Sequence, residues 1–277
     1  MSDLTFNISG VPVVLSHLSP SLVRQFRSNW KEFLSTIDHP ARLRVRVSAS
    51  SETVPSGQFA SELTVKLNQD NARFTLPEGH IELDETGLAR MTLASGGVAS
   101  QYHAVVNLLC AAMAWILPSD GTVLLHAAGV VLEERAFVMV GPSGSGKTTW
   151  ATLAKQAGAM FLSDDLLFVD ASGPGAEVLS TPFRANHPRP HGPARWPLAA
   201  ILLPVHGSPS SLAPANRLEV ISRLTANLPF MSQAFARNRR LEPLIEHLAD
   251  SVQAFHLTFS KDRRFLEWLQ RLAAPGV

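Results

Sequence analysis

The feature that most constrains the fold of this chain is the segment from Gly141 to Thr148, with the sequence GPSGSGKT. It matches the phosphate-loop pattern GxxxxGK[ST] at every fixed position, and a chain of this composition would show a chance match about three times in a thousand. The required context is also present, because an apolar strand is expected over 136–140 and a helix over 147–157. The sequence therefore predicts an α/β unit in which this loop surrounds the phosphates of a nucleotide.

The residue types in the loop suit that task. Backbone N–H groups, helped by the positive end of the following helix, hydrogen-bond phosphate oxygens, and the glycines allow a close approach. Lys147 is expected to reach the β- and γ-phosphates, and Thr148 to bind Mg²⁺. The predicted nucleotide-binding residues are Gly141, Ser143, Gly144, Ser145, Gly146, Lys147, Thr148 and Thr149.

The same loop sequence, GPSGSGKTT, is common in ABC ATPases. That class also needs an LSGGQ-type signature downstream of the loop and an Asp-Glu pair after a run of apolar residues. Here Ser95-Gly96-Gly97 lies before the loop, and no Asp-Glu pair follows it. The sequence therefore excludes an ABC ATPase.

Two carboxylates, Asp164 and Asp165, follow the apolar segment expected to form a strand over 160–162. Phosphoryl transfer needs one carboxylate that holds Mg²⁺ and one that accepts the proton of the acceptor hydroxyl. A solvated turn or a helix cap is the alternative interpretation of such a pair. After a phosphate-loop unit, the catalytic interpretation is the stronger one.

His126 precedes the loop and is followed by Ala127, Ala128 and Gly129. These small residues leave space around the imidazole, which suits a crevice. A histidine at a strand end is more often structural, so from the residues alone both interpretations stay open.

Composition narrows the class of protein. Of the 277 residues, 45% are hydrophobic and 17% are charged, which excludes a disordered chain. The net charge of +1 argues against a dedicated nucleic-acid-binding protein. The single cysteine, Cys110, allows neither an internal disulfide nor a cysteine-based zinc site. The N-terminus lacks a signal-peptide pattern, and the apolar run over 105–117 is short for a membrane span, so we expect a cytoplasmic protein with no membrane partner.

The pattern of strands and helices predicts two parts. Residues 1–97 are expected to form a smaller, β-rich α+β region with one helix, which begins at Pro20 and is capped by Ser19. Residues 98–277 mix strands and helices, beginning with a long helix over 98–117, and are expected to form an α/β catalytic domain. The segments 122–125 and 129–132 are expected to be separate strands.

Taken together, His126-Ala127-Ala128, the loop and Ser163-Asp164-Asp165 resemble the catalytic domain of the HPr kinase/phosphorylase family. That family shares its nucleotide-binding core with phosphoenolpyruvate carboxykinases. The likeness covers roughly residues 120–277 and is strongest over 122–170. The segment 255–260, which leads into the final helix, is similar more weakly.

The resemblance implies an ATP-dependent, Mg²⁺-requiring serine kinase. It implies that Lys147 stabilises the transferring phosphoryl group, that Thr148 and Asp164 bind Mg²⁺, and that Asp165 is the general base. It also implies that His126 orients Asp164 and Asp165 or tunes their charge. Family members are often hexameric, so a homo-oligomer is one possible assembly for this chain.

The chain departs from the family pattern after Asp165, where an acidic residue followed by Arg-Gly-Leu-Gly is absent. This removes an expected metal ligand and points away from HPr itself as the acceptor. Divergent relatives act on peptides, so the leading partner is a protein or peptide that carries a serine, with residues 1–97 recognising it or mediating assembly. The alternatives are a kinase of a small molecule on the same core and a non-catalytic ATP-binding regulator.

A proline-rich basic segment spans Arg184 to Arg195. It predicts either a lid that supplies an arginine to the γ-phosphate or a solvated surface loop. The arginines over 237–240 lie on a helix expected over 231–250, where a solvated face is the better interpretation.

Overall fold

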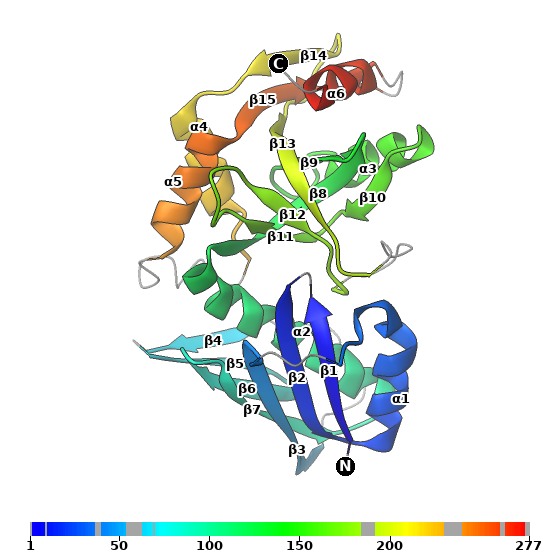
Figure 1. Cartoon of the computed structure of the whole chain (residues 1–277), viewed down its shortest axis with the longest axis vertical. Helices are drawn as coiled ribbons and strands as arrows, with labels where there is room; N and C mark the ends of the chain where they lie inside the picture. The colour runs from blue at the N-terminus through cyan, green and yellow to red at the C-terminus, as the bar shows by residue number, and fades with distance from the viewer. Residues whose placement is uncertain are drawn as a thin grey trace. The chain divides into compact units, whose positions relative to one another are not determined.

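The structure is a computed structural model that describes residues 2–8, 10–36, 40–53, 63–68, 70–183, 192–229, 240–260 and 264–274 (Figure 1). The chain divides into two compact units, Met1–Leu117 and Pro118–Val277. The boundary thus lies after Leu117, whereas the sequence placed it after residue 97. The reason is that helix α2 (Val98–Ile116) packs on the sheet of the first unit, against β5, β6 and β7.

The N-terminal unit is built on a seven-stranded mixed sheet with the order β1-β2-β3-β7-β6-β5-β4. The β2–β3 and β3–β7 pairs are parallel, and the other pairs are antiparallel. The strands are β1 (Ser2–Ile8), β2 (Val11–Leu18), β3 (Leu43–Thr53), β4 (Thr64–Leu67), β5 (Asn71–Leu76), β6 (Gly79–Asp84) and β7 (Leu88–Ser95).

Helix α1 (Pro20–Asn29) begins as the sequence predicts. The Ser19 Oγ accepts a hydrogen bond from the backbone N–H of Leu22, and proline occupies the first helical position. A 3₁₀ turn, η1 (Lys31–Phe33), follows it. Phe26 of α1 is fully buried and contacts the ring of Tyr102 on α2, with 4.8 Å between ring centroids, so both helices share one core.

Helix α2 continues into a second 3₁₀ turn, η2 (Leu117–Asp120), so the helical segment is longer than its apolar run alone indicated. The combined segment Val98–Asp120 has 23 residues and is long and apolar enough to cross a membrane by length and composition alone. Its most apolar stretch is 72% buried within the protein. Core packing of α2 therefore accounts for its composition.

The C-terminal unit contains an eight-stranded mixed sheet. Its strands are β8 (Thr122–Leu132), β9 (Arg135–Val140), β10 (Met160–Ser163), β11 (Leu166–Asp170), β12 (Glu177–Leu179), β13 (Arg195–Pro204), β14 (Ser211–Pro214) and β15 (Gln253–Thr258). β9 pairs in parallel with β13 and antiparallel with β8, and β13 pairs in parallel with β15. This mixed α/β architecture is compatible with a P-loop nucleotide-binding fold.

Two long strands change partners along their length. The first half of β8 pairs with β11, and its second half pairs with β9 and β10. β13 likewise pairs first with β12 and then with β9 and β15. The sequence prediction of two separate strands over 122–132 is wrong, because Ala127, Ala128 and Gly129 stay in the ladder while the strand exchanges partners.

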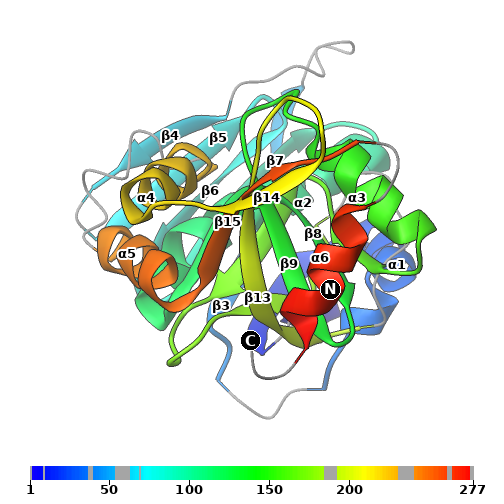
Figure 2. The same cartoon turned by 90° about the horizontal axis from the view of Figure 1, so that it is seen from above.

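Helices cover both faces of this sheet (Figure 2). α3 and α6 pack on one face, where they bury Trp150 and Phe265 against β8, β9 and β13. α5 contacts β8 and β15 on the other face and packs against α4. The helices are α3 (Lys147–Gln156), α4 (Arg217–Ala226), α5 (Leu241–Ser251) and α6 (Phe265–Ala273). The first part of the helix expected over 231–250 lies outside the described residues.

Candidate active site

The phosphate loop connects the buried strand β9 to helix α3, as the sequence predicts (Figure 1). Gly144 and Gly146 have positive φ angles, +78° and +94°, which are costly for any residue with a Cβ atom. At Gly146 an added Cβ would also lie 3.2 Å from the ring of Phe259. Both glycines are therefore required by the backbone path of the loop.

Lys147 is folded back onto the loop. Its side-chain ammonium donates hydrogen bonds to the carbonyl oxygens of Gly141, at 2.7 Å, and Pro142, at 3.1 Å. Burial lowers the pKa of Lys147, and the negative charge of Asp165 partly opposes that effect. This electrostatic effect indicates that the Lys147 ammonium and the Asp165 carboxylate lie near each other.

Ser145 provides a test of whether the loop fits a phosphate. The residue is 8% exposed, and its Oγ has no hydrogen-bond partner among the described residues. A buried hydroxyl without a partner is costly, and a phosphate oxygen is an acceptor that would satisfy it. The loop therefore fits the phosphate group of a nucleotide.

The side chains of His126 and Asp165 contact each other in the structure. The distance between His126 Nδ1 and Asp165 Oδ1 is 2.9 Å. Strand register produces this contact, because His126 of β8 lies opposite Leu166, the residue after Asp165. One residue further along β8, the N–H of Ala127 donates to the carbonyl oxygen of Asp165 at 2.9 Å.

Ala127 also links the acidic pair to the phosphate loop. On its other side it is the antiparallel partner of Val140, the last residue of β9 before the loop. A single residue of β8 thus lies between Asp165 and the entrance of the loop. This register explains why the His-Ala step and the Asp-Asp pair, far apart in the sequence, define one site.

A tight turn presents the two carboxylates. The Ser163 Oγ accepts hydrogen bonds from the backbone N–H groups of Asp165, at 3.2 Å, and Leu166, at 3.3 Å. Asp164 is half-buried, whereas the Asp165 side chain is 58% exposed. The turn therefore leaves Asp165 accessible to an acceptor molecule from outside.

The predicted metal ligands, Thr148 and Asp164, lie on α3 and on the turn after β10. Within the part of the chain that the structure describes, no three His, Cys, Asp or Glu side chains gather into a metal site. Mg²⁺ usually takes one or two protein ligands and completes its shell with phosphates and water, and Thr148 and Asp164 are the residues that would hold it here. Ser143 and Thr149 are exposed on the loop and on the first turn of α3.

Three residues near the site were not in the predicted set. The carbonyl oxygen of Asn227, after α4, accepts the backbone N–H of His126 at 2.7 Å. Phe259 lies over Gly146, and Pro204 lies against Gly141. Of these three residues, only Phe259 could have been suggested by the sequence, because it lies in segment 255–260, which weakly resembles the HPr kinase/phosphorylase family. The other two depend on long-range packing.

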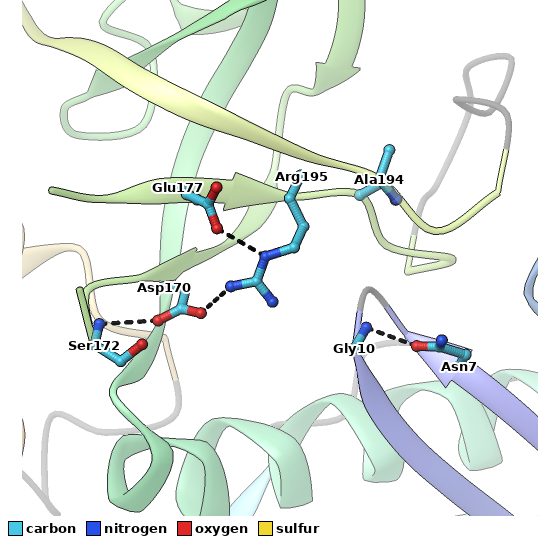
Figure 3. Close-up of polar contacts among 8 residues, drawn as sticks. Asn7, Gly10, Asp170, Ser172, Glu177, Ala194 and Arg195 are labelled. Atoms are coloured by element: carbon cyan, nitrogen blue, oxygen red, sulfur yellow. Dashed lines mark hydrogen bonds and ion pairs between the residues drawn. The ribbon is translucent and has the colours of Figure 1, made fainter. Parts of the chain in front are cut away.

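The structure describes only the end of the basic segment from Arg184 to Arg195. Residues 184–191 lie outside the described residues, so a lid in that part stays a prediction. Arg195, at its end, belongs to β13 and pairs with Asp170 and Glu177 (Figure 3). Burial acts to raise the pKa of Asp170, but hydrogen bonds from Ser172 and Arg195 outweigh it and hold the value below the usual range. Arg195 thus joins three strands instead of reaching for a phosphate.

Comparison with known proteins supports the assignment of a P-loop nucleotide-binding domain. A family model described as an AAA domain matches residues 137–194, from within β9 through the phosphate loop and the acidic pair to the residue before β13. The chain contains a nucleotide-binding P-loop domain. No curated protein matches the chain. The match covers the predicted loop residues together with Asp164 and Asp165.

Proposed function

We propose that the protein is an ATP-dependent, Mg²⁺-requiring kinase of the HPr kinase-like type that phosphorylates a serine of a protein or peptide. The observation that carries this proposal is the 2.9 Å contact between His126 Nδ1 and Asp165 Oδ1 beside the phosphate loop. A nucleotide-binding loop alone is compatible with hydrolysis or regulation. A carboxylate held by an imidazole next to that loop adds a base for an acceptor hydroxyl.

The side chains have separate tasks in this mechanism. The loop and Lys147 would hold the phosphates, and Lys147 would exchange its two carbonyl partners for phosphate oxygens. Asp165 would accept the proton of the attacking serine hydroxyl, while His126 keeps the carboxylate oriented. Thr148 and Asp164 would hold Mg²⁺, which neutralises charge on the phosphates when bound.

Exposure of the base supports a large acceptor. The Asp165 side chain is 58% exposed, so its carboxylate is open to a serine on a chain that stays mostly outside the site. A kinase of a small molecule would instead enclose its acceptor beside the base. The open position of Asp165 therefore favours a protein or peptide over a small molecule.

The experiment incubates the purified protein with Mg²⁺ and γ-labelled ATP, with and without lysate of its own organism. We expect label on a protein or peptide band, and a loss of transfer of about 10²–10⁴-fold in Asp165→Asn, the range for removing a general base. Asp120→Asn removes an exposed carboxylate of the same unit and is the matched control.

Three results would contradict the proposal. Full transfer by Asp165→Asn would exclude Asp165 as the base. Label on a small molecule would favour the alternative acceptor class. ATP binding without transfer or hydrolysis would favour a non-catalytic regulator.

A further inference from the structure

The sheet of the N-terminal unit has one face that its helices do not cover. Along β3 and β7 the buried residues alternate with exposed ones, so Val45 and Met91 face the core while Arg44, Arg46 and Arg90 face outward. This outer face is hollowed into a groove of about 460 Å³. The groove is lined by Ser16, Arg44, Arg46, Asn71, Glu82, Leu83, Asp84, Leu88, Ala89 and Arg90.

Three arginines in this groove lie close together. Arg46 is the direct cross-strand partner of Arg90, and Arg44 lies two residues before Arg46 on the same strand. Among the described residues, none of the three side chains makes a hydrogen bond or an ion pair. Like charges placed side by side on a sheet are destabilising, so a counter-charge from outside would relieve this arrangement.

The carboxylates of the groove are already engaged. Glu82 accepts a hydrogen bond from Arg73 at 2.6 Å. Asp84 caps the turn after β6, where its Oδ1 accepts from the N–H and hydroxyl groups of Thr86. Glu82 is also the cross-strand partner of Arg90 but is paired with Arg73, so the excess charge of the groove is the positive charge of the arginines on β3 and β7.

The chemistry of the groove distinguishes between anionic partners. Single-stranded nucleic acids are held by aromatic side chains on which the bases stack, and the lining residues include no Phe, Tyr or Trp. Leu88, which is 57% exposed beside Arg44, offers an apolar contact that suits a peptide side chain.

We propose that this groove binds an extended acidic peptide segment of a partner protein. Residues i and i+2 of an extended chain are about 7 Å apart, which is the spacing of Arg44 and Arg46 along β3. A segment with carboxylates at alternate positions and a neighbouring apolar residue therefore matches Arg44, Arg46 and Leu88. Binding of this segment does not depend on phosphoryl transfer at the other unit.

The test uses a fluorescent synthetic peptide with alternating glutamates around a leucine, followed by fluorescence anisotropy on the full-length protein. We expect saturable binding that weakens at high NaCl, and affinity at least about tenfold lower for the glutamine analogue. The double variant Arg46→Gln/Arg90→Gln should lose about tenfold. The control Arg24→Gln/Arg27→Gln removes the same charge from exposed positions on α1 and should bind normally.

Several outcomes would overturn this inference. These are no binding, equal binding of the glutamine analogue, an equal loss in the α1 control, or tighter binding of oligothymidylate than of the acidic peptide. Thermal unfolding checks that each double variant is folded, and the peptide comparison on the unaltered protein does not depend on any variant. Asp165→Asn should bind the peptide normally, so failure of the proposed kinase reaction and failure of peptide binding are separate results.

Discussion

The buried hydroxyl of Ser145 provides the sharpest test of the phosphate site. Without a nucleotide, its Oγ has no partner among the described residues, and an unsatisfied buried polar group costs about 1–3 kcal/mol. Ser145→Ala removes that group. We expect the free energy of unfolding of the C-terminal unit to rise by about 1–3 kcal/mol in the absence of nucleotide, or about 2–4 °C in Tm for each kcal/mol.

The same substitution should weaken the stabilisation that Mg²⁺ and ATP give the protein. At about 100 times its Kd, ATP stabilises the unaltered protein by about 2.7 kcal/mol. A hydrogen bond to a charged phosphate is worth about 1.5–3 kcal/mol, so the variant should gain only about 0.3–1.3 kcal/mol at the same ATP concentration. ATP should therefore stabilise the variant by about 1.4–2.4 kcal/mol less than it stabilises the unaltered protein.

Calorimetric unfolding with and without Mg²⁺ and ATP measures both quantities. Ser143→Ala is the control for the nucleotide-free measurement, because this serine is exposed on the same loop and its substitution should change stability by less than about 0.5 kcal/mol. A nucleotide-free Ser145→Ala protein that is less stable than the unaltered one would refute the reasoning. So would a variant that keeps the full stabilisation by ATP.

Two further predictions concern stability at acid pH and the shape of the loop. Because Asp170 has a pKa below its ordinary value of 3.8, its ionised form stabilises the fold above that value, and this is lost as pH falls through the lower folded-state pKa. Arg195→Gln should lower the free energy of unfolding by about 1–3 kcal/mol at neutral pH, and it should reduce the loss of stability on acidification measured by urea unfolding. Arg217→Gln removes an arginine from an exposed pair and should change the free energy of unfolding little. Gly144→Ala and Gly146→Ala should each strain the loop by about 1–2 kcal/mol. The loss of ATP affinity should be larger for Gly146→Ala, because the ring of Phe259 also crowds the added Cβ atom. Equal losses of affinity in titration calorimetry would contradict the role of that contact.

Much of the local structure follows directly from the sequence. The Ser19 cap and the helix after it depend on neighbouring residues, and they appear where the pattern predicts. The phosphate loop is equally local, because its glycines, its lysine and the strand and helix around it are contiguous. The family match over residues 137–194 supports this part of the site.

Contacts between distant segments needed the tertiary structure. The separation of His126 and Asp165 along the chain does not say that they touch; the register of β8 against β11 does. A register shift by one residue would turn the side chain of His126 to the other face of the sheet. The burial of Ser145 and the hydrogen bond from His126 to the carbonyl oxygen of Asn227 likewise come from packing between elements that are remote in the sequence.

The sequence by itself determined that the chain contains a phosphate-binding loop, since the chemistry of that loop lies in consecutive residues. Only the tertiary structure decided that α2 belongs to the first unit, that Arg195 joins strands, and that Arg44, Arg46 and Arg90 share one open face. Side chains gather on a face only when strands pair in one register, and that pairing is a long-range property of the folded chain.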